Sequence, residues 1–257
     1  MYTEPLSSGH SVVERPGDRE VVYERDPAGW NVVCCIGMLL TFDVTGRNVA
    51  ILSHPDFISD WEARPYQVRA LLTTLSEPTL LVLPTAAGKS LIEYLFLHEY
   101  FVRSNKKDSR ALLIAPTNAL VDQHRSNLVE LFDSRFVVTC LTGSTSPARR
   151  VDLWAKSDFI VATPQVVRND LEASRISSAD FTAVVFDEAH HAKGSHAMAA
   201  AGRLLRLGSE IPVCMGATAS PGTSPSEVTS LCSVLGLTNI HARSSQDSEL
   251  LPFIPEL

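Results

Sequence analysis

Two short stretches of the sequence combine residue types and spacings that could do chemistry. The first is Gly88-Lys89-Ser90, which follows an apolar run and opens a helical pattern. Backbone N–H groups at a helix start bind phosphate, so in such a loop Lys89 reaches the β- and γ-phosphates of a nucleotide and Ser90 coordinates Mg²⁺. A lone G-K-S is a frequent accident, however, and Leu83 stands at the first glycine of the full G-x-x-x-x-G-K-S pattern.

The second stretch is an adjacent pair of carboxylates, Asp187 and Glu188, at the end of the apolar run 184–186. At a strand end Asp187 could hold Mg²⁺, and Glu188 could orient and deprotonate an attacking water. The plainer interpretation is an acidic surface pair that caps the next helix. Beside a phosphate loop, the metal and base roles are the better interpretation.

The elements that must position these residues alternate between short apolar runs and helical patterns from residue 80 onward. This alternation is typical of βαβ units, and consecutive apolar positions indicate strands covered on both faces. We therefore expect an α/β domain with one doubly wound parallel sheet of six strands. The predicted strands are Leu80–Leu83, Ala111–Ala115, Val137–Leu141, Phe159–Ala162, Ala183–Phe186 and Val213–Gly216, and the predicted helices are Lys89–Val102, Asn118–Phe132, Gln165–Ala173 and Ala197–Leu207.

The composition is that of an ordinary globular chain, with 257 residues of which 45% are hydrophobic and 20% charged. Five cysteines without C-x-x-C spacing support neither a disulfide framework nor a zinc ribbon, and they predict a reducing, cytoplasmic setting. No signal peptide and no run near the ~18 apolar residues of a membrane span is present in the sequence. The net charge of −7 excludes a general nucleic-acid coat protein but leaves room for local contacts.

The signature blocks of the superfamily-two helicases and translocases occur here in their expected order. They are Arg64–Gln67, which resembles the adenine-reading block, Pro84–Ser90 (motif I), Ala115–His124 (motif Ia), Leu141–Gly143, Ala162–Gln165 (motif Ib), Asp187–His190 (the DEAH box, motif II) and Ala217–Ser220 (motif III). The stretches VATPQVVRNDL, VVFDEAHHAKG and GATASPG most resemble the archaeal Hef and Fanconi-anaemia M branch, which acts on forked and branched DNA. The resemblance covers about residues 60 to 245 and implies a RecA-like P-loop NTPase fold.

The resemblance implies that ATP and Mg²⁺ are the cofactors and that two blocks bind the nucleotide. The implied nucleotide-binding residues are Arg64, Tyr66, Gln67, Pro84, Thr85, Ala86, Ala87, Gly88, Lys89 and Ser90, with Ser90 and Asp187 on Mg²⁺ and Lys89, Asp187 and Glu188 as catalytic residues. Motif I commonly reads x-T-G-x-G-K-T in this superfamily, so Leu83 is no objection, whereas Ala86 replaces a glycine. An alanine is tolerated there at negative φ and costs ~1 kcal/mol or more at positive φ.

Three threonines, Thr117, Thr142 and Thr163, each follow a predicted strand at a helix start or turn, where hydroxyls and free N–H groups can hold a phosphate backbone. Each one alone is better explained as an ordinary helix N-cap. Because all three fall at the carboxyl edge of the sheet, together they predict a groove. The nucleic-acid contacts implied by the resemblance are Pro116, Thr117, Thr142, Gly143, Thr163, Pro164 and Gln165.

His190 is assigned by the resemblance to coupling between the nucleotide site and motif III. The motif III partners of this coupling are Thr218, Ala219 and Ser220. His190, His191 and His196 do not have the spacing of a standard metal-ligand pattern, so we expect no metal site at these three histidines.

The predicted domains are an N-terminal extension over residues 1–60, a RecA-like ATP-binding domain over 61–245 and a tail or linker over 246–257. In the extension, predicted strands indicate an antiparallel appendage. These strands are Val32–Ile36, Met38–Phe42 and Val49–Leu52, with a turn at Asp43–Asn48. The segment after Ile240 is polar and then contains proline, which is typical of an edge or linker.

A second RecA-like domain, which supplies arginine fingers and half of the nucleic-acid track in this superfamily, is not found in the sequence. The chain alone is therefore expected to bind ATP and hydrolyse it poorly, with forked or branched DNA and a second RecA-like domain as partners. Two alternatives stay open. One is the motor domain of a double-stranded-RNA ATPase or restriction-type translocase, and the other is a non-hydrolysing, nucleotide-dependent nucleic-acid-binding fragment.

Overall fold

The computed structural model describes residues 10–15, 19–25, 31–35, 38–42, 50–104 and 109–251. The chain divides into two compact units. The first comprises residues 1–68 with 131–133, and the second comprises residues 69–130 with 134–257.

The first unit is built on an antiparallel sheet whose strands follow one another in chain order, β1-β2-β3-β4-β5-β6. The strands are β1 (His10–Arg15), β2 (Arg19–Arg25), β3 (Asn31–Cys35), β4 (Met38–Phe42), β5 (Ala50–Ser53) and β6 (Trp61–Ala63). The antiparallel pairing predicted for this part of the chain is confirmed between β3 and β4 and between β4 and β5. The predicted turn Asp43–Asn48 and the predicted strand ends Ile36 and Val49 lie outside the described residues.

The second unit contains a parallel sheet with the strand order β13-β7-β12-β11-β8-β10-β9. The strands are β7 (Thr79–Val82), β8 (Arg110–Ile114), β9 (Val138–Leu141), β10 (Phe159–Ala162), β11 (Phe181–Asp187), β12 (Val213–Thr218) and β13 (Asn239–Ala242). The six predicted strands are present, and the predicted doubly wound α/β fold is confirmed. The prediction of only six strands is wrong, because β13 pairs in parallel with β7 as a further strand.

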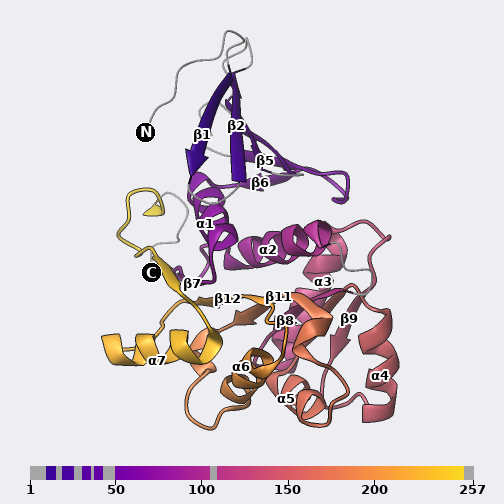
Figure 1. Cartoon of the computed structure of the whole chain (residues 1–257). Coiled ribbons are helices and arrows are strands. Elements are labelled where there is room, and N and C mark those ends of the chain that lie inside the picture. Colours follow the sequence, from indigo (N-terminus) through magenta and orange to yellow (C-terminus); the bar gives the residue numbers. More distant parts are fainter. Residues whose placement is uncertain are drawn as a thin grey trace. The chain divides into compact units, whose positions relative to one another are not determined.

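Helices cover both faces of this parallel sheet, with α2 and α3 on one side and α5 and α6 on the other (Figure 1). The helices are α1 (Pro65–Ser76), α2 (Lys89–Arg103), α3 (Asn118–Leu131), α4 (Pro147–Lys156), α5 (Pro164–Glu172), α6 (Ala197–Leu207) and α7 (Pro225–Leu235), with short 3₁₀ turns at Ser178–Asp180 and Ala189–His191. Strands between two helical layers must be apolar on consecutive positions, and β10 accordingly has no exposed residue.

The register of the parallel sheet places one residue of each strand in a single row, at or within two residues of the carboxyl end of its strand. Successive pairs place Leu141, Ala162, Ile114, Phe186, Gly216, Leu80 and Ile240 side by side from β9 to β13. Apart from the block Arg64–Gln67, the segments predicted to bind nucleotide or nucleic acid begin one to four residues after this row. Because ligands in open α/β sheets sit beyond the carboxyl ends of the strands, the fold brings these segments to one edge.

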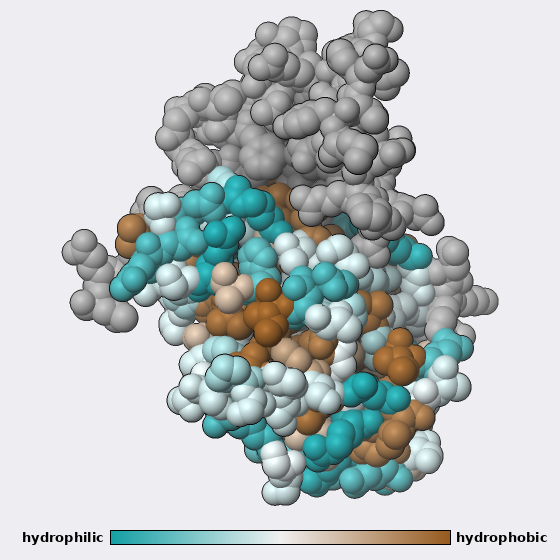
Figure 2. All heavy atoms as spheres, turned by 60° about the vertical axis from the view of Figure 1, so that its left-hand side comes forward, coloured by the Kyte–Doolittle hydropathy of each residue, from teal (hydrophilic) through white to brown (hydrophobic). Residues whose placement is uncertain are grey.

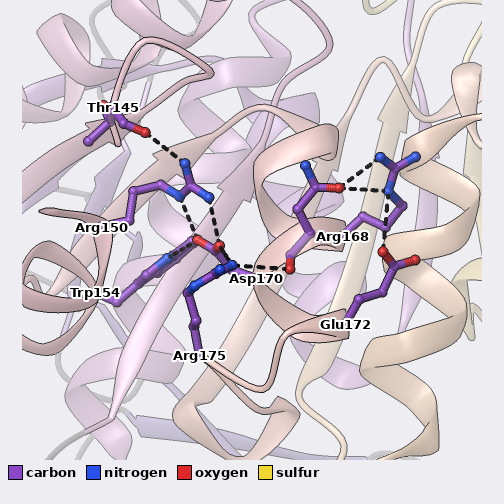
Figure 3. A network of polar contacts seen from close by, with 8 residues as sticks. Thr145, Arg150, Trp154, Arg168, Asp170, Glu172 and Arg175 are labelled. Atoms are coloured by element: carbon purple, nitrogen blue, oxygen red, sulfur yellow. Dashed lines mark hydrogen bonds and ion pairs between the residues drawn. The ribbon is translucent and has the colours of Figure 1, made fainter. Parts of the chain in front are cut away.

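A buried polar network joins α4 to α5 on one face of the sheet (Figure 3). Asp170 of α5, with no exposed surface, accepts hydrogen bonds from Arg150 Nε and Nη2, each at 2.7 Å, and from Trp154 Nε1 at 2.8 Å. Arg175 adds a further ion pair at 2.9 Å. Arg150 Nη1 also donates to the carbonyl of Thr145, so the network holds the loop after β9 and the helix after β10 together.

The surface in Figure 2 mixes hydrophilic and hydrophobic residues. Single exposed apolar side chains such as Leu207 and Ile240 account for part of the hydrophobic surface of the second unit and are normal for a folded domain. Among the described residues, no helix has both the length and the apolar character needed to cross a membrane.

Candidate nucleotide site

The loop between β7 and α2 has the backbone shape of a phosphate loop but includes a strained residue. Gly88 caps α2 in the left-handed region with φ 70°. Ala86 is also left-handed, with φ 64°. Ala87 is buried, and its N–H donates to the Pro84 carbonyl at 3.2 Å. The loop therefore needs positive φ at the position where this chain carries alanine in place of glycine, and this is the costly conformation for an alanine.

Lys89 is the first residue of α2 and its side chain folds back over the loop. Its Nζ donates to the Leu83 carbonyl at 3.2 Å and to the Pro84 carbonyl at 3.3 Å. These are neutral acceptors, which anionic phosphate oxygens would outcompete for an ammonium group. Ser90 follows on the helix and is partly buried. The ammonium group is thus held over the loop by two backbone carbonyls.

Asp187 and Glu188 stand at the end of β11, two strands away from β7 in the sheet. The Asp187 carboxylate is 6% exposed, and its Oδ1 accepts the Glu188 N–H at 2.8 Å. Glu188 has φ 49° and ψ 49°, so the chain turns sharply at the strand end. Glu188 Oε2 lies 3.2 Å from His190 Nδ1, and both side chains are about one third exposed. The first carboxylate is therefore fixed and the second is accessible.

A chain of hydrogen bonds holds the other oxygen of Asp187. His124 Nε2 on α3 lies 2.9 Å from Asp187 Oδ2. The opposite ring nitrogen, Nδ1, lies 2.8 Å from the Tyr94 hydroxyl, which also accepts from Asn127 Nδ2 at 3.1 Å. Sequence reasoning missed this arrangement, although His124 is the last residue of motif Ia. The fold thus places a buried imidazole between α2, α3 and the DEAH box.

Glu93, one helical turn after Lys89, is a second feature that the sequence did not predict. The residue is fully buried, and neither carboxyl oxygen has a hydrogen-bond partner in the described part of the chain. Burial, followed by the negative charge of Asp187, raises the pKa of this carboxyl well above its ordinary value. Its Oε2 lies 4.0 Å from His124 Nδ1.

Motif III contacts both the phosphate loop and the DEAH box. The Thr218 carbonyl at the end of β12 accepts the Leu83 N–H at 3.2 Å. The buried Thr218 hydroxyl lies 3.0 Å from His190 Nδ1 and accepts the Ser220 N–H at 3.2 Å. Burial, together with the neighbouring His191, lowers the pKa of His190, which favours a neutral imidazole in this contact.

The three threonines predicted to line a groove differ in exposure. Thr117 is exposed, and its hydroxyl accepts the Leu120 N–H at 3.3 Å, as a helix cap does. Thr142 and Thr163 are buried, at 8% and 5% exposure, and the Thr142 hydroxyl lies 2.8 Å from that of Ser144. The accessible surface at the strand ends comes from other predicted contacts. Gly143 and Gln165 are exposed, whereas Pro116 is intermediate and Pro164 is buried.

The predicted adenine-reading residues lie in the first unit, at the start of α1. Arg64 Nη1 donates to the Tyr66 hydroxyl at 2.9 Å, and the Arg64 N–H donates to Gln67 Oε1 at 2.8 Å. Tyr66 is 1% exposed and Gln67 is 6% exposed. The residues form a compact hydrogen-bonded group, and their role in reading adenine stays a prediction.

Comparison with known proteins finds relatives in sequence and in structure. A Methanocaldococcus jannaschii protein named as a candidate ATP-dependent RNA helicase is 34% identical over 197 residues, which are 76% of this chain and 25% of that protein. The DEAD-box ATP-dependent DNA helicase Fancm of Drosophila melanogaster is 32% identical over 74% of this chain and 13% of its own length. In structure, the Pyrococcus furiosus Hef helicase domain matches with a TM-score of 0.70 and 35% identity, over 76% of this chain and 41% of that one.

The chain therefore spans a minor part of the length of the relatives it matches, between 13% and 41% in these three comparisons. The family described as DEAD/DEAH box helicase matches residues 64–228, which are the larger part of the chain and include the phosphate loop, the DEAH box and motif III. The chain belongs to the DEAD/DEAH box helicase family.

Proposed function

We propose that this chain contains the ATP-binding first motor domain of a DNA helicase or translocase that acts on branched or forked DNA. The observation that carries the proposal is the convergence of Lys89, the Asp187–Glu188 pair and Thr218 at adjacent strand ends. The Leu83 N–H donates to the Thr218 carbonyl, and the Thr218 hydroxyl is hydrogen-bonded to His190 Nδ1, so Thr218 contacts both the phosphate loop and the DEAH box.

Nucleotide binding is assigned to the loop between β7 and α2. Lys89 exchanges its carbonyl partners for the β- and γ-phosphates, and the N–H groups at the start of α2 bind phosphate oxygens. The Ser90 hydroxyl and the Asp187 carboxylate are oxygen donors of the kind that Mg²⁺ prefers, so this donor set fits the ion. When bound, Mg²⁺ neutralises charge on the phosphates.

Hydrolysis is assigned to Glu188, whose carboxylate is accessible beside the fixed Asp187. A carboxylate in this position can orient a water molecule and accept its proton as the water attacks the γ-phosphate. Asp187 cannot take that role as readily, because His124 and the Glu188 N–H already hold its two oxygens. His190 and Thr218, with Ala219 and Ser220, form the coupling contact to motif III.

Full activity is proposed to need a second RecA-like domain, supplied in cis or in trans, that brings arginine fingers to the γ-phosphate. The nucleic-acid track on this chain is assigned to the strand ends after β8, β9 and β10, where Thr117, Gly143 and Gln165 are exposed. Contacts of this type go to the phosphate backbone and give a sequence-independent grip.

DNA is the preferred substrate in this proposal because relatives such as Fancm are named as DNA helicases. The Methanocaldococcus jannaschii relative is named as a candidate RNA helicase, so RNA is the second candidate. The test pairs the chain with a matched second RecA-like domain and measures ATP hydrolysis with forked DNA, double-stranded DNA or double-stranded RNA of equal length. Greater stimulation by double-stranded RNA than by forked DNA would favour the second candidate, and no stimulation by any of them would contradict the motor function.

A further inference from the structure

Three buried side chains form a cluster at the DEAH box, and two of them, Glu93 and His124, have no role in the proposed nucleotide binding. Glu93 comes from α2, His124 from α3 and Asp187 from the end of β11. One potential ligand atom from each residue lies within 4.8 Å of the other two, and all three residues are buried. The cluster is therefore assembled by the packing of α2 and α3 against the sheet, not by local sequence.

Glu93 is the member of this cluster whose surroundings are unusual. A buried carboxyl group normally has hydrogen-bond donors, an ion-pair partner or a metal ion. Within the described residues, Glu93 has no hydrogen-bond donor, and its nearest basic group is His124 Nδ1 at 4.0 Å. Lys89, one turn earlier on α2, donates to the carbonyls of Leu83 and Pro84 instead. The Glu93 carboxyl group therefore lies near the His124 imidazole and the Asp187 carboxylate but forms a hydrogen bond with neither.

We propose that Glu93, His124 and Asp187 form a binding site for a first-row divalent cation that accepts an imidazole nitrogen, with Zn²⁺ as the representative ion. The inference is separate from the Mg²⁺ that accompanies the nucleotide. It rests on the proposed function in one respect only, which is that Asp187 also binds the Mg²⁺ of the nucleotide.

The chemistry of the three groups fits such an ion. Two carboxylates balance its double charge, and a neutral imidazole completes a set of three protein ligands with a fourth position open. With metal–ligand bonds of ~2.0–2.2 Å, ligand atoms around a tetrahedral ion are roughly 3.3 Å apart. His124 Nε2 and Asp187 Oδ2 are 2.9 Å apart as hydrogen-bond partners, so the ion would replace the proton between them and these two atoms would separate slightly. Glu93 Oε2, which lies 4.0 Å from the opposite ring nitrogen Nδ1, would have to move toward the Nε2 side. Mg²⁺ is the poorer fit, because it keeps several waters and favours oxygen ligands.

Tyr94 and Asn127 provide the outer contacts that an imidazole ligand needs. A histidine binds one ion through one ring nitrogen, and a hydrogen bond to the other nitrogen fixes the ring. The Tyr94 hydroxyl lies 2.8 Å from His124 Nδ1 and is itself held by Asn127 Nδ2 at 3.1 Å. Nε2, which faces Asp187, is therefore the nitrogen assigned to the ion.

An ion at this site would withdraw Asp187 from the nucleotide site. Zn²⁺ and Mg²⁺-ATP are therefore expected to oppose each other, and linkage requires that each weakens the other by the same factor. The cluster would act as an inhibitory metal site buried behind the DEAH box.

The test titrates the nucleotide-free chain with Co²⁺, which substitutes for Zn²⁺ and has visible absorption bands that report its ligands. A single Co²⁺ is expected to bind, with bands of nitrogen and oxygen ligation and no thiolate charge-transfer band, and Zn²⁺ is expected to displace it. Glu93→Gln and His124→Asn each remove one ligand and are expected to weaken binding at least tenfold. Asp122→Asn removes an exposed carboxylate of α3 and is expected to bind Co²⁺ as the unmodified chain does.

Circular dichroism of each variant verifies folding, and because the two substitutions lie on different helices, one remains informative if the other unfolds. Absence of Co²⁺ binding, a thiolate band, or folded Glu93→Gln and His124→Asn chains that bind as tightly as Asp122→Asn would overturn the inference. Binding of Mg²⁺-ATP is measured separately. If the unmodified chain binds Co²⁺ as expected but does not bind Mg²⁺-ATP in the absence of Co²⁺, the proposed function alone is contradicted. If it binds Mg²⁺-ATP but does not bind Co²⁺, this inference alone is contradicted.

Discussion

The hydroxyl of Thr218 lies 3.0 Å from Nδ1 of His190, and this contact joins the end of β12 to the DEAH box. The carbonyl of the same threonine accepts the N–H of Leu83, at the base of the phosphate loop. One residue of motif III therefore touches both parts of the candidate site. A movement of β12 would therefore change the contact of Thr218 with His190 and its contact with Leu83 together.

Replacing Thr218 by valine tests this coupling, because valine keeps the shape and removes the hydroxyl. We expect Mg²⁺-ATP affinity to change less than threefold, while stimulation of ATP hydrolysis by DNA falls at least tenfold in a pair completed by a second RecA-like domain. Thr229→Val on the exposed side of α7 is the control. Equal stimulation in the two variants would show that the contact does not transmit the signal.

Lys89→Ala tests the phosphate loop. If Lys89 neutralises the β- and γ-phosphates, its removal is expected to weaken ATP binding by at least about 1.4 kcal/mol, a factor of ten. Calorimetry or a fluorescent ATP analogue measures the affinity, with Lys156→Ala at an exposed position of α4 as the control for loss of a positive charge. Unchanged affinity in Lys89→Ala would place the nucleotide elsewhere.

Glu188→Gln and Asp187→Asn are expected to differ, because only Glu188 is assigned to activating water. Glu188→Gln is expected to leave Mg²⁺-ATP affinity within about threefold and to lower kcat by ~10² or more. Asp187→Asn is expected to lose Mg²⁺-dependent affinity as well. Both are measured in the reconstituted pair. Hydrolysis by Glu188→Gln at the unmodified rate would remove the catalytic assignment.

Ala86→Gly tests the strain in the phosphate loop. Ala86 has φ 64°, a conformation that costs an alanine about 1–2 kcal/mol and a glycine almost nothing. After the greater freedom of glycine in the unfolded chain is subtracted, we expect the free energy of unfolding to rise by roughly 0.5–1 kcal/mol. Ala155→Gly, at an exposed helical position of α4, is expected to change it in the opposite direction. A lower stability for Ala86→Gly in urea unfolding would contradict the strain.

Asp170→Asn tests the buried network between α4 and α5. Burial by itself would raise the pKa of Asp170, but hydrogen bonds from Arg150 and Trp154 lower it overall. The folded pKa is thus below the unfolded one, so this carboxylate stabilises the fold above the unfolded pKa of about 3.9 and ceases to do so as pH falls through the folded value.

At neutral pH the substitution leaves the Arg150 guanidinium without its charged partner and is expected to cost about 3–5 kcal/mol. Urea unfolding at pH 7 and at progressively lower pH measures the difference between the unmodified chain and Asp170→Asn. A difference that does not shrink in acid would show that charge is not what the network contributes.

Much of the parallel sheet could be predicted from the sequence because each inner strand contains a run of consecutive apolar or small residues, as strands covered on both faces do. The strand β13 could not be predicted from an apolar run, because it is an edge strand whose four residues alternate between partly buried and exposed. The helix α4 was also missed. Its buried face consists of Arg150 and Trp154, too little for an apolar period, and its start is set by the Ser146 cap and Pro147.

The candidate site also contains some residues that the sequence indicates and others that only the structure brings together. Lys89, Ser90, Asp187 and Glu188 could be proposed from the sequence because the motifs that contain them are short and continuous. Glu93, Tyr94 and His124 were not, since they meet only through the packing of α2 against α3 and β11. The left-handed backbone at Ala86 likewise follows from the shape of the loop and not from the preference of the residue.

The pairing of β13 with β7 also sets a limit on how the chain can be shortened. β7 leads directly into the phosphate loop, and in the described part of the chain β13 is its neighbour on the side away from β12. A shortened chain that stops before Asn239 would turn β7 into an open edge with unpaired N–H and C=O groups, a surface that recruits other strands and promotes aggregation. Boundaries for recombinant production therefore belong after Ala242, even though motif III is complete at Ser220.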